Sequence, residues 1–149
     1  VNLHLTLVFL GSLHEDTLED VHLAFSRLRA PPFDLTLRGV EAFGGARPRN
    51  VWAGVAPSAG LTHLQRKVET AARGAGVVIE ARRFTPHVTL GRFRPNEADM
   101  PRLERGMVDC AGFSAGPFAV TRFALMRSHL GRAGAEYDVL ESYALDTDD

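Results

Sequence analysis

Apolar and polar residues alternate over short stretches of this chain, and between those stretches the apolar residues recur at helical spacing. The stretch LHLTLVFLG (3–11) is rich in leucine, valine and phenylalanine and ends at Gly11, which predicts a strand. The segment 14–29 has acids in its first turn and two prolines just beyond its end, which predicts a helix. Its apolar positions are three or four residues apart: Leu18, Val21, Phe25 and Leu28.

The rest of the chain continues this succession of strands and helices. Helical spacing predicts two more helices, at 60–76 and 96–111. Short runs of β-branched, aromatic and leucine residues predict the other strands, at 33–43, 50–56, 77–82, 87–93, 117–128 and 136–145. The pattern as a whole indicates an α/β (α+β) protein.

The order of these elements recurs once, which indicates an internal duplication. Each half consists of a strand with His-x-Thr, a helix, a strand that opens with Pro-Phe, and a closing strand. The His-x-Thr strands are 83 residues apart, and the Pro-Phe strands are 85 residues apart. We therefore expect two pseudo-symmetric lobes, with repeat halves at approximately 1–59 and 77–146.

The second half contains elements that the first half lacks. A helix and a short strand within 60–83 precede the second His-x-Thr strand, whereas only three residues precede the first. We therefore expect that a single domain spanning 1–149 lacks an N-terminal strand and helix, a segment of roughly 30 to 40 residues, the size of a βα unit.

Composition agrees with one soluble globular domain. The 149 residues are 45% hydrophobic and 23% charged, and the formal net charge of −1 provides no global field that would attract nucleic acid. No apolar run approaches the roughly 20 residues that span a bilayer, and the single Cys110 excludes an intrachain disulfide. We expect a monomer in the reducing cytoplasm, without contact with a membrane.

The segments HLTL (4–7) and HVTL (87–90) share one motif. Side chains two residues apart on a strand project from the same face, so each His lies beside its Thr. A half-exposed strand would explain one such pair. Two pairs, at matching places of a repeat in a chain with six His and nine Thr, favour a functional site. The opposite face of each strand is expected to point into the core with Leu3, Leu5, Leu7, Val88 and Leu90.

Two histidines that face one another suit a concerted proton transfer, because one neutral imidazole can accept a proton while a protonated one donates. Threonine hydroxyls can donate hydrogen bonds to oxygens that carry negative charge. The candidate catalytic residues are therefore His4, Thr6, His87 and Thr89, a set that suits attack at phosphorus. The chain has no His-x-x-x-His and no short-spaced His/Asp/Glu cluster, so we expect neither a metal nor another cofactor.

Two further residues are candidates for binding a substrate. Arg92 is five residues after His87, an odd offset, so it reaches the same face only if Gly91 allows a bend or bulge. Phe9 is at the matching position after His4. An arginine for phosphate and an aromatic ring for base stacking would suit a nucleotide, although the apolar pattern alone favours a core position for Phe9. Of the remaining histidines, those at 14, 22 and 63 are more simply explained as structural residues, whereas the pattern leaves the role of the one at 129, near a turn, open.

These motifs resemble the two signature motifs of the two-histidine (2H) phosphoesterase superfamily. More narrowly, the chain is similar to the bacterial and archaeal RNA 2′,3′-cyclic phosphodiesterases, also called 2′-5′ RNA ligases. The similarity extends through the segment 32–55 and through the late segment LMRSHLGRAGAEYDVL (125–140), and it covers essentially the whole chain. The family has one more strand and helix before its first motif, in agreement with the segment that we expect to be missing.

The resemblance implies antiparallel sheets on either side of a central cleft, with helices outside. It implies metal-independent hydrolysis of RNA 2′,3′-cyclic phosphate ends to a 2′-phosphate, with the reverse reaction forming a 2′-5′ linkage. His4 and Thr6 match the first motif, His87 and Thr89 the second, and Arg92 the phosphate-contacting arginine of the family. Phe9 matches an aromatic residue near the nucleoside. We expect His87 to be the base and His4 the acid.

Two alternatives have a different substrate or no reaction. The same site could act on a small cyclic nucleotide or on a cyclic ADP-ribose phosphate. The same fold could also serve as a non-catalytic module that binds RNA ends, although binding alone would not need two titratable imidazoles.

Overall fold

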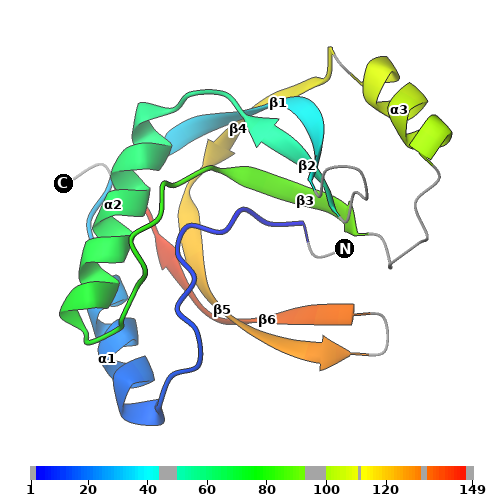
Figure 1. Cartoon of the computed structure of the whole chain (residues 1–149). Coiled ribbons are helices and arrows are strands. Elements are labelled where there is room, and N and C mark those ends of the chain that lie inside the picture. Colours follow the sequence, from blue (N-terminus) through cyan, green and yellow to red (C-terminus); the bar gives the residue numbers. More distant parts are fainter. Residues whose placement is uncertain (1–2, 44–49, 93–99, 111, 132–133, 147–149) are drawn as a thin grey trace.

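A computed structural model describes residues 3–43, 50–92, 100–110, 112–131 and 134–146 (Figure 1). Three helices and six strands follow one another in this part of the chain. In order they are α1 (Glu15–Ser26), β1 (Phe33–Phe43), β2 (Asn50–Val55), α2 (Ala59–Gly74), β3 (His87–Arg92), α3 (Met100–Asp109), β4 (Ser114–Val120), β5 (Arg122–Gly131) and β6 (Gly134–Ala144). None of these helices is long and apolar enough to cross a bilayer.

The strands form two antiparallel sheets. One has four strands in the order β3-β2-β1-β4, and the other is the hairpin of β5 and β6. In Figure 1 the N-terminal segment runs between the free edge of β3 and this hairpin. The mixed architecture and the antiparallel pairing confirm the predicted fold class.

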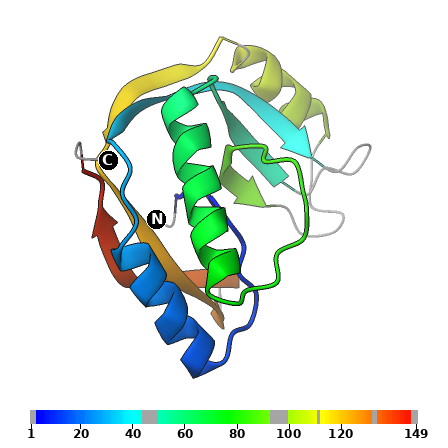
Figure 2. The same ribbon diagram turned by 90° about the vertical axis from the view of Figure 1, so that its left-hand side faces the viewer.

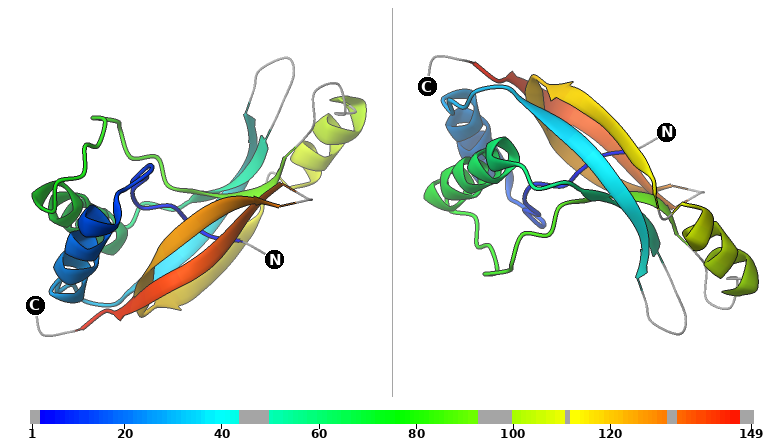
Figure 3. Two further views of the ribbon diagram at one scale, coloured as in Figure 1. Left: turned by 90° about the horizontal axis from the view of Figure 1, so that it is seen from below. Right: turned by 90° about the horizontal axis from the view of Figure 1, so that it is seen from above.

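The core lies between the two longer helices and the hairpin. Figure 2 shows α1 and α2 side by side, and their buried residues pack against the base of β5 and β6. The rings of Phe123 and Tyr143 meet the ring of Phe25 edge-on, each at a centroid distance of 5.7 Å. Figure 3 shows α3 at the other end of the four-stranded sheet, away from α1 and α2. The residues that the two helices contribute to this buried cluster are Val21, Phe25, Leu64, Val68 and Ala72.

Three of the predicted strands differ from the structure. The segment 117–128 divides at Thr121, because there the chain leaves the four-stranded sheet as β4 and enters the hairpin as β5. No strand forms at 77–82: Val77 and Ile79 pack against the core and Val78 between them is 93% exposed, but this segment pairs with no strand of the described chain. The first predicted strand, 3–11, is reduced to a single antiparallel bridge.

The N-terminal segment is instead held by packing and one side-chain hydrogen bond. Leu7, Val8 and Leu10 pack against the core, and the buried Gln65 of α2 donates from Nε2 to the carbonyl oxygen of Leu7 at 3.3 Å. These contacts fix the segment between the two sheets without a continuous ladder of backbone hydrogen bonds.

A close backbone contact at Gly54 of β2 leads to a prediction on stability. A Cβ at this position would lie 2.6 Å from the carbonyl oxygen of Arg38, so Gly54→Ala must displace one of the two strands. We expect it to lower the free energy of unfolding by about 1–3 kcal/mol in urea titrations. Gly74→Ala is the matched control, because a Cβ there meets nothing within 4 Å and alanine favours the helix. Equal stability of the two variants would contradict the prediction.

A second prediction concerns Tyr143, whose hydroxyl lies 2.8 Å from Nδ1 of His22. Burial, with the carboxylate of Glu141 nearby, raises the pKa of Tyr143 to about 12. A tyrosine in the unfolded chain ionises near pH 10, so this contribution to stability is complete below about pH 10 and is lost as the pH rises toward 12. Urea midpoints should therefore fall over this interval. In Tyr143→Phe the urea midpoint should fall less over this interval, whereas Tyr137→Phe should behave like the wild-type protein. If the two variants have the same dependence of midpoint on pH, Tyr143 is not the group responsible.

Candidate active site

One antiparallel bridge joins the two His-x-Thr motifs. It pairs Leu5 with Val88, the middle residues of the two motifs. Continuing the antiparallel register by one residue in each direction places His4 across from Thr89 and Thr6 across from His87. In that register the four candidate catalytic residues would lie at the corners of a square, with the two imidazoles on one diagonal and the two hydroxyls on the other.

The size of this square suits a phosphate group. Residues directly opposite on antiparallel strands have Cβ atoms about 4.5–5.5 Å apart, and diagonal neighbours about 7–8 Å. A tetrahedral phosphate between the diagonal imidazoles could be reached by all four side chains. His4, His87 and Thr89 are half-buried and Thr6 is exposed, so a ligand has access to them.

The imidazole of His87 has a defined tautomer. Its Nδ1 lies 2.9 Å from the carbonyl oxygen of Thr85, which can only accept a hydrogen bond, so Nδ1 carries the proton. In the neutral ring Nε2 is therefore the basic nitrogen. A general base needs this arrangement, in which one nitrogen is anchored and the other is free to accept a proton.

Each imidazole also contacts an aromatic ring that we did not single out as a site residue from the sequence. The ring of Trp52 on β2 lies against His87, with ring centroids 4.3 Å apart. The ring of Tyr137 on β6 lies against His4, with centroids 4.4 Å apart. Trp52 and Tyr137 are 85 residues apart in the two closing strands, the same offset as the Pro-Phe strands. That offset is the signal that could have identified them.

The bulge required for Arg92 is present. The pairing of β2 with β3 moves from Val51–Gly91 to Trp52–Thr89, so that Leu90 is an extra, unpaired residue. His87 therefore pairs with Gly54, Thr89 with Trp52, and Arg92 with Asn50. These three partners are each two residues apart on β2. Arg92 thus has a register position on the same face as the motif, while its side chain is outside what the structure describes.

The predicted core faces of the two motifs are only partly correct. Val88 is buried and Leu7 packs against the core. Leu90 is 44% exposed because it is the extra residue of the bulge. Leu3 is 57% exposed, and Phe9, for which the apolar pattern favoured the core, is 79% exposed. The N-terminal segment has a single bridge and does not form a regular strand, so its backbone does not turn Leu3 and Phe9 toward the core.

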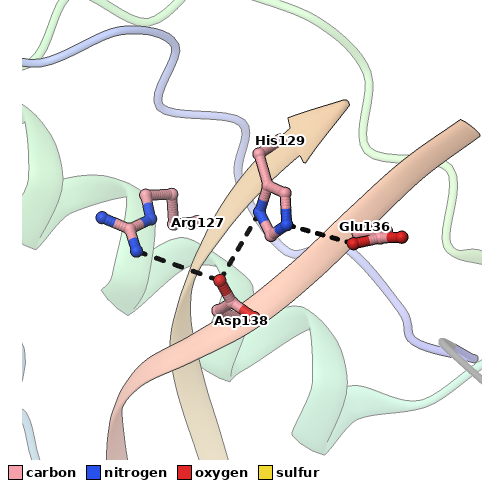
Figure 4. Close-up of polar contacts among 4 residues, drawn as sticks. All are labelled: Arg127, His129, Glu136 and Asp138. Atoms are coloured by element: carbon pink, nitrogen blue, oxygen red, sulfur yellow. Dashed lines mark hydrogen bonds and ion pairs between the residues drawn. The ribbon is translucent and has the colours of Figure 1, made fainter. Parts of the chain in front are cut away.

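The histidine of the hairpin does not join the site. His129 Nε2 lies 3.2 Å from Glu136, its Nδ1 lies 3.5 Å from Asp138, and Arg127 approaches the same Asp138 at 3.9 Å (Figure 4). His129 pairs with Glu136 in the hairpin register, one position from Tyr137, so this group is on the face opposite the ring that contacts His4. Within the described residues, no group of three or more His, Cys, Asp or Glu could hold a metal ion.

Comparisons with known proteins agree with this site. The family model of the 2′-5′ RNA ligase superfamily matches residues 1–132. The RNA 2′,3′-cyclic phosphodiesterase of Aeropyrum pernix is 33% identical over 141 residues, which are 93% of this chain and 80% of that protein. The Escherichia coli protein of the same name is 34% identical, over 97% of this chain and 76% of its own.

Solved structures show the same fold. Escherichia coli LigT in complex with 3′-AMP superposes with a TM-score of 0.72 at 31% identity, over 97% of this chain and 77% of its own. TT0787 of Thermus thermophilus superposes with a TM-score of 0.75 at 28% identity, over 99% of this chain and 80% of its own. The resemblance inferred from the motifs is confirmed, and this chain belongs to the 2′-5′ RNA ligase superfamily.

Proposed function

We propose that the protein hydrolyses 2′,3′-cyclic phosphate ends of RNA to 2′-phosphates without a metal, by acid–base catalysis between His4 and His87. The observation that carries this proposal is the bridge between Leu5 and Val88, since it brings both motifs to one place. The printed names of the relatives, RNA 2′,3′-cyclic phosphodiesterase, support the reaction and its substrate.

In the proposed step a water molecule attacks phosphorus opposite the O3′ atom. His87 Nε2 takes a proton from the water as the new P–O bond forms, and His4 donates a proton to O3′ as the P–O3′ bond breaks. The products are a 2′-phosphate and a free 3′-hydroxyl. The anchored Nδ1 of His87 favours this assignment of the base, because it leaves Nε2 as the accepting nitrogen.

The other four groups would bind the substrate. The hydroxyls of Thr6 and Thr89 would donate hydrogen bonds to the non-bridging oxygens, whose charge grows in the transition state. Arg92 would contact the phosphate, and the exposed ring of Phe9 would offer a surface for the base.

The same site could also join two RNA ends. If a 5′-hydroxyl RNA end takes the place of water, His87 and His4 keep their roles and a 2′-5′ linkage forms; the breakdown of that linkage exchanges them. We further propose that the protein acts as a monomer in the cytoplasm. Its free and exposed Cys110 is compatible with a reducing compartment.

Product analysis tests the proposed reaction. An oligonucleotide that ends in a 2′,3′-cyclic phosphate should yield only the 2′-phosphate end, at a rate that EDTA leaves unchanged. A 3′-phosphate product, or loss of turnover in EDTA, would contradict the mechanism. A higher kcat/KM for cyclic mononucleotides than for oligonucleotides would favour a small cyclic nucleotide as substrate. Binding of the oligonucleotide without turnover would favour a binding module.

A further inference from the structure

The two aromatic contacts at the histidines are nearly the same in geometry. Trp52 and His87 have ring centroids 4.3 Å apart at an interplanar angle of 50°, and Tyr137 and His4 have centroids 4.4 Å apart at 59°. In both contacts the aromatic residue belongs to the closing strand of one repeat half and the histidine to the motif of the other half. One arrangement of ring against imidazole therefore occurs twice, once in each lobe.

The position of Trp52 in the sheet explains how its ring reaches His87. Trp52 is paired with Thr89, and Gly54, two residues further along β2, is paired with His87. The indole ring thus lies diagonally across the strand pair from the imidazole, with ring centroids 4.3 Å apart. Diagonal neighbours of this kind are within reach of aromatic side chains.

The indole ring is itself held in place. Trp52 Nε1 donates a hydrogen bond to Oε2 of Glu41 at 3.2 Å, and Glu41 is its direct partner on β1. On its other side the imidazole is fixed by the hydrogen bond from Nδ1 to Thr85. His87 is thus held at one ring face by Trp52 and at one ring nitrogen by the backbone, which leaves Nε2 as the nitrogen available for reaction.

We propose that Trp52 and Tyr137 are positioning residues for His87 and His4, each restricting the rotation of an imidazole so that its reactive nitrogen stays directed at the phosphate. The χ2 torsion of histidine is broad, so an unsupported ring would sample many orientations. Small misplacements of a catalytic group reduce rates strongly. This inference rests on the proposed function.

Kinetics of paired substitutions test the positioning role. Trp52→Leu and Tyr137→Leu should each lower kcat on a 2′,3′-cyclic phosphate by about 10- to 100-fold and change KM by less than about twofold. Trp52→Phe and Tyr137→Phe keep a flat ring and should restore most of the lost kcat. A rise in KM with unchanged kcat would mean that the ring binds substrate instead, and equal activity of the Leu and Phe variants would also overturn the proposal.

Fluorescence provides a readout that does not depend on turnover. Trp52 is the one tryptophan in the sequence, and an imidazole in contact with an indole ring quenches its emission. Emission should therefore rise in His87→Gln, which removes this imidazole, and stay unchanged in His14→Gln. If the wild-type protein turns over no cyclic phosphate, the proposed function fails, whatever the fluorescence. If it turns over while the Leu variants keep full kcat, or if His87→Gln leaves the quenching intact, the positioning proposal fails.

Discussion

Replacing His87 by alanine is expected to lower kcat for the opening of a 2′,3′-cyclic phosphate by about 10²- to 10⁴-fold, the usual contribution of a positioned general base. His4→Ala should cause a loss of similar size, because it removes the acid for the departing O3′. Steady-state release of 2′-phosphate ends measures both. The expectation follows from the bridge between Leu5 and Val88, which brings the two motifs side by side.

The double variant distinguishes one shared site from two independent ones. If the base and the acid act in one step, His4→Ala combined with His87→Ala should lose little more activity than either variant alone. His14→Ala is the matched control, since His14 is exposed and its side chain makes no capping hydrogen bond at the start of α1. Near-normal turnover in both single variants would rule out the proposed mechanism.

Phe25→Ala is expected to destabilise the protein by about 3–5 kcal/mol, as truncations of buried aromatic residues do. Phe25 is 3% exposed, and the rings of Phe123 and Tyr143 pack edge-on against it. These contacts connect α1 to the hairpin that carries Tyr137, so the cavity left by the substitution would loosen one side of the site. Urea unfolding monitored by circular dichroism gives the change in free energy.

A control on the same helix isolates the effect of burial. Leu23 is 49% exposed, so Leu23→Ala should cost less than about 1 kcal/mol although it also truncates a large apolar side chain of α1. In a chain of this length each kcal/mol lowers the melting temperature by about 2–4 °C. Equal melting temperatures for the two variants would show that α1 does not pack on the hairpin as described.

Much of the fold could be predicted from local pattern. The helical spacing from Leu18 to Leu28 predicts α1, and the apolar runs give the strands of the four-stranded sheet within a few residues. The chemistry of the site could also be proposed from the sequence, because the His and Thr of each His-x-Thr motif are two residues apart and so lie on the same face of an extended segment. Arg92 can share the face of its motif only if the strand bends or bulges near Gly91, and the structure has a bulge at the neighbouring Leu90.

The features that could not be predicted depend on tertiary contacts. The N-terminal segment has the composition of a strand, but Gln65 and the core hold it with only one bridge to β3. At Thr121 the chain passes from the four-stranded sheet to the hairpin. The alternation of apolar and polar residues does not show such a change, because both sides of Thr121 are strands. Trp52 and Tyr137 look like ordinary strand aromatics, and it is the tertiary contact of Trp52 with His87 and of Tyr137 with His4 that distinguishes them.

His4 and His87 are proposed to act on one and the same phosphate. Histidine-selective NMR during titration with a nucleoside 2′-monophosphate, the product of the proposed reaction, tests it most directly. The signals of His4 and His87 should shift together with a single dissociation constant, while those of His14 and His63 remain unchanged. A shift of only one of the two signals, or two different dissociation constants, would contradict the shared site.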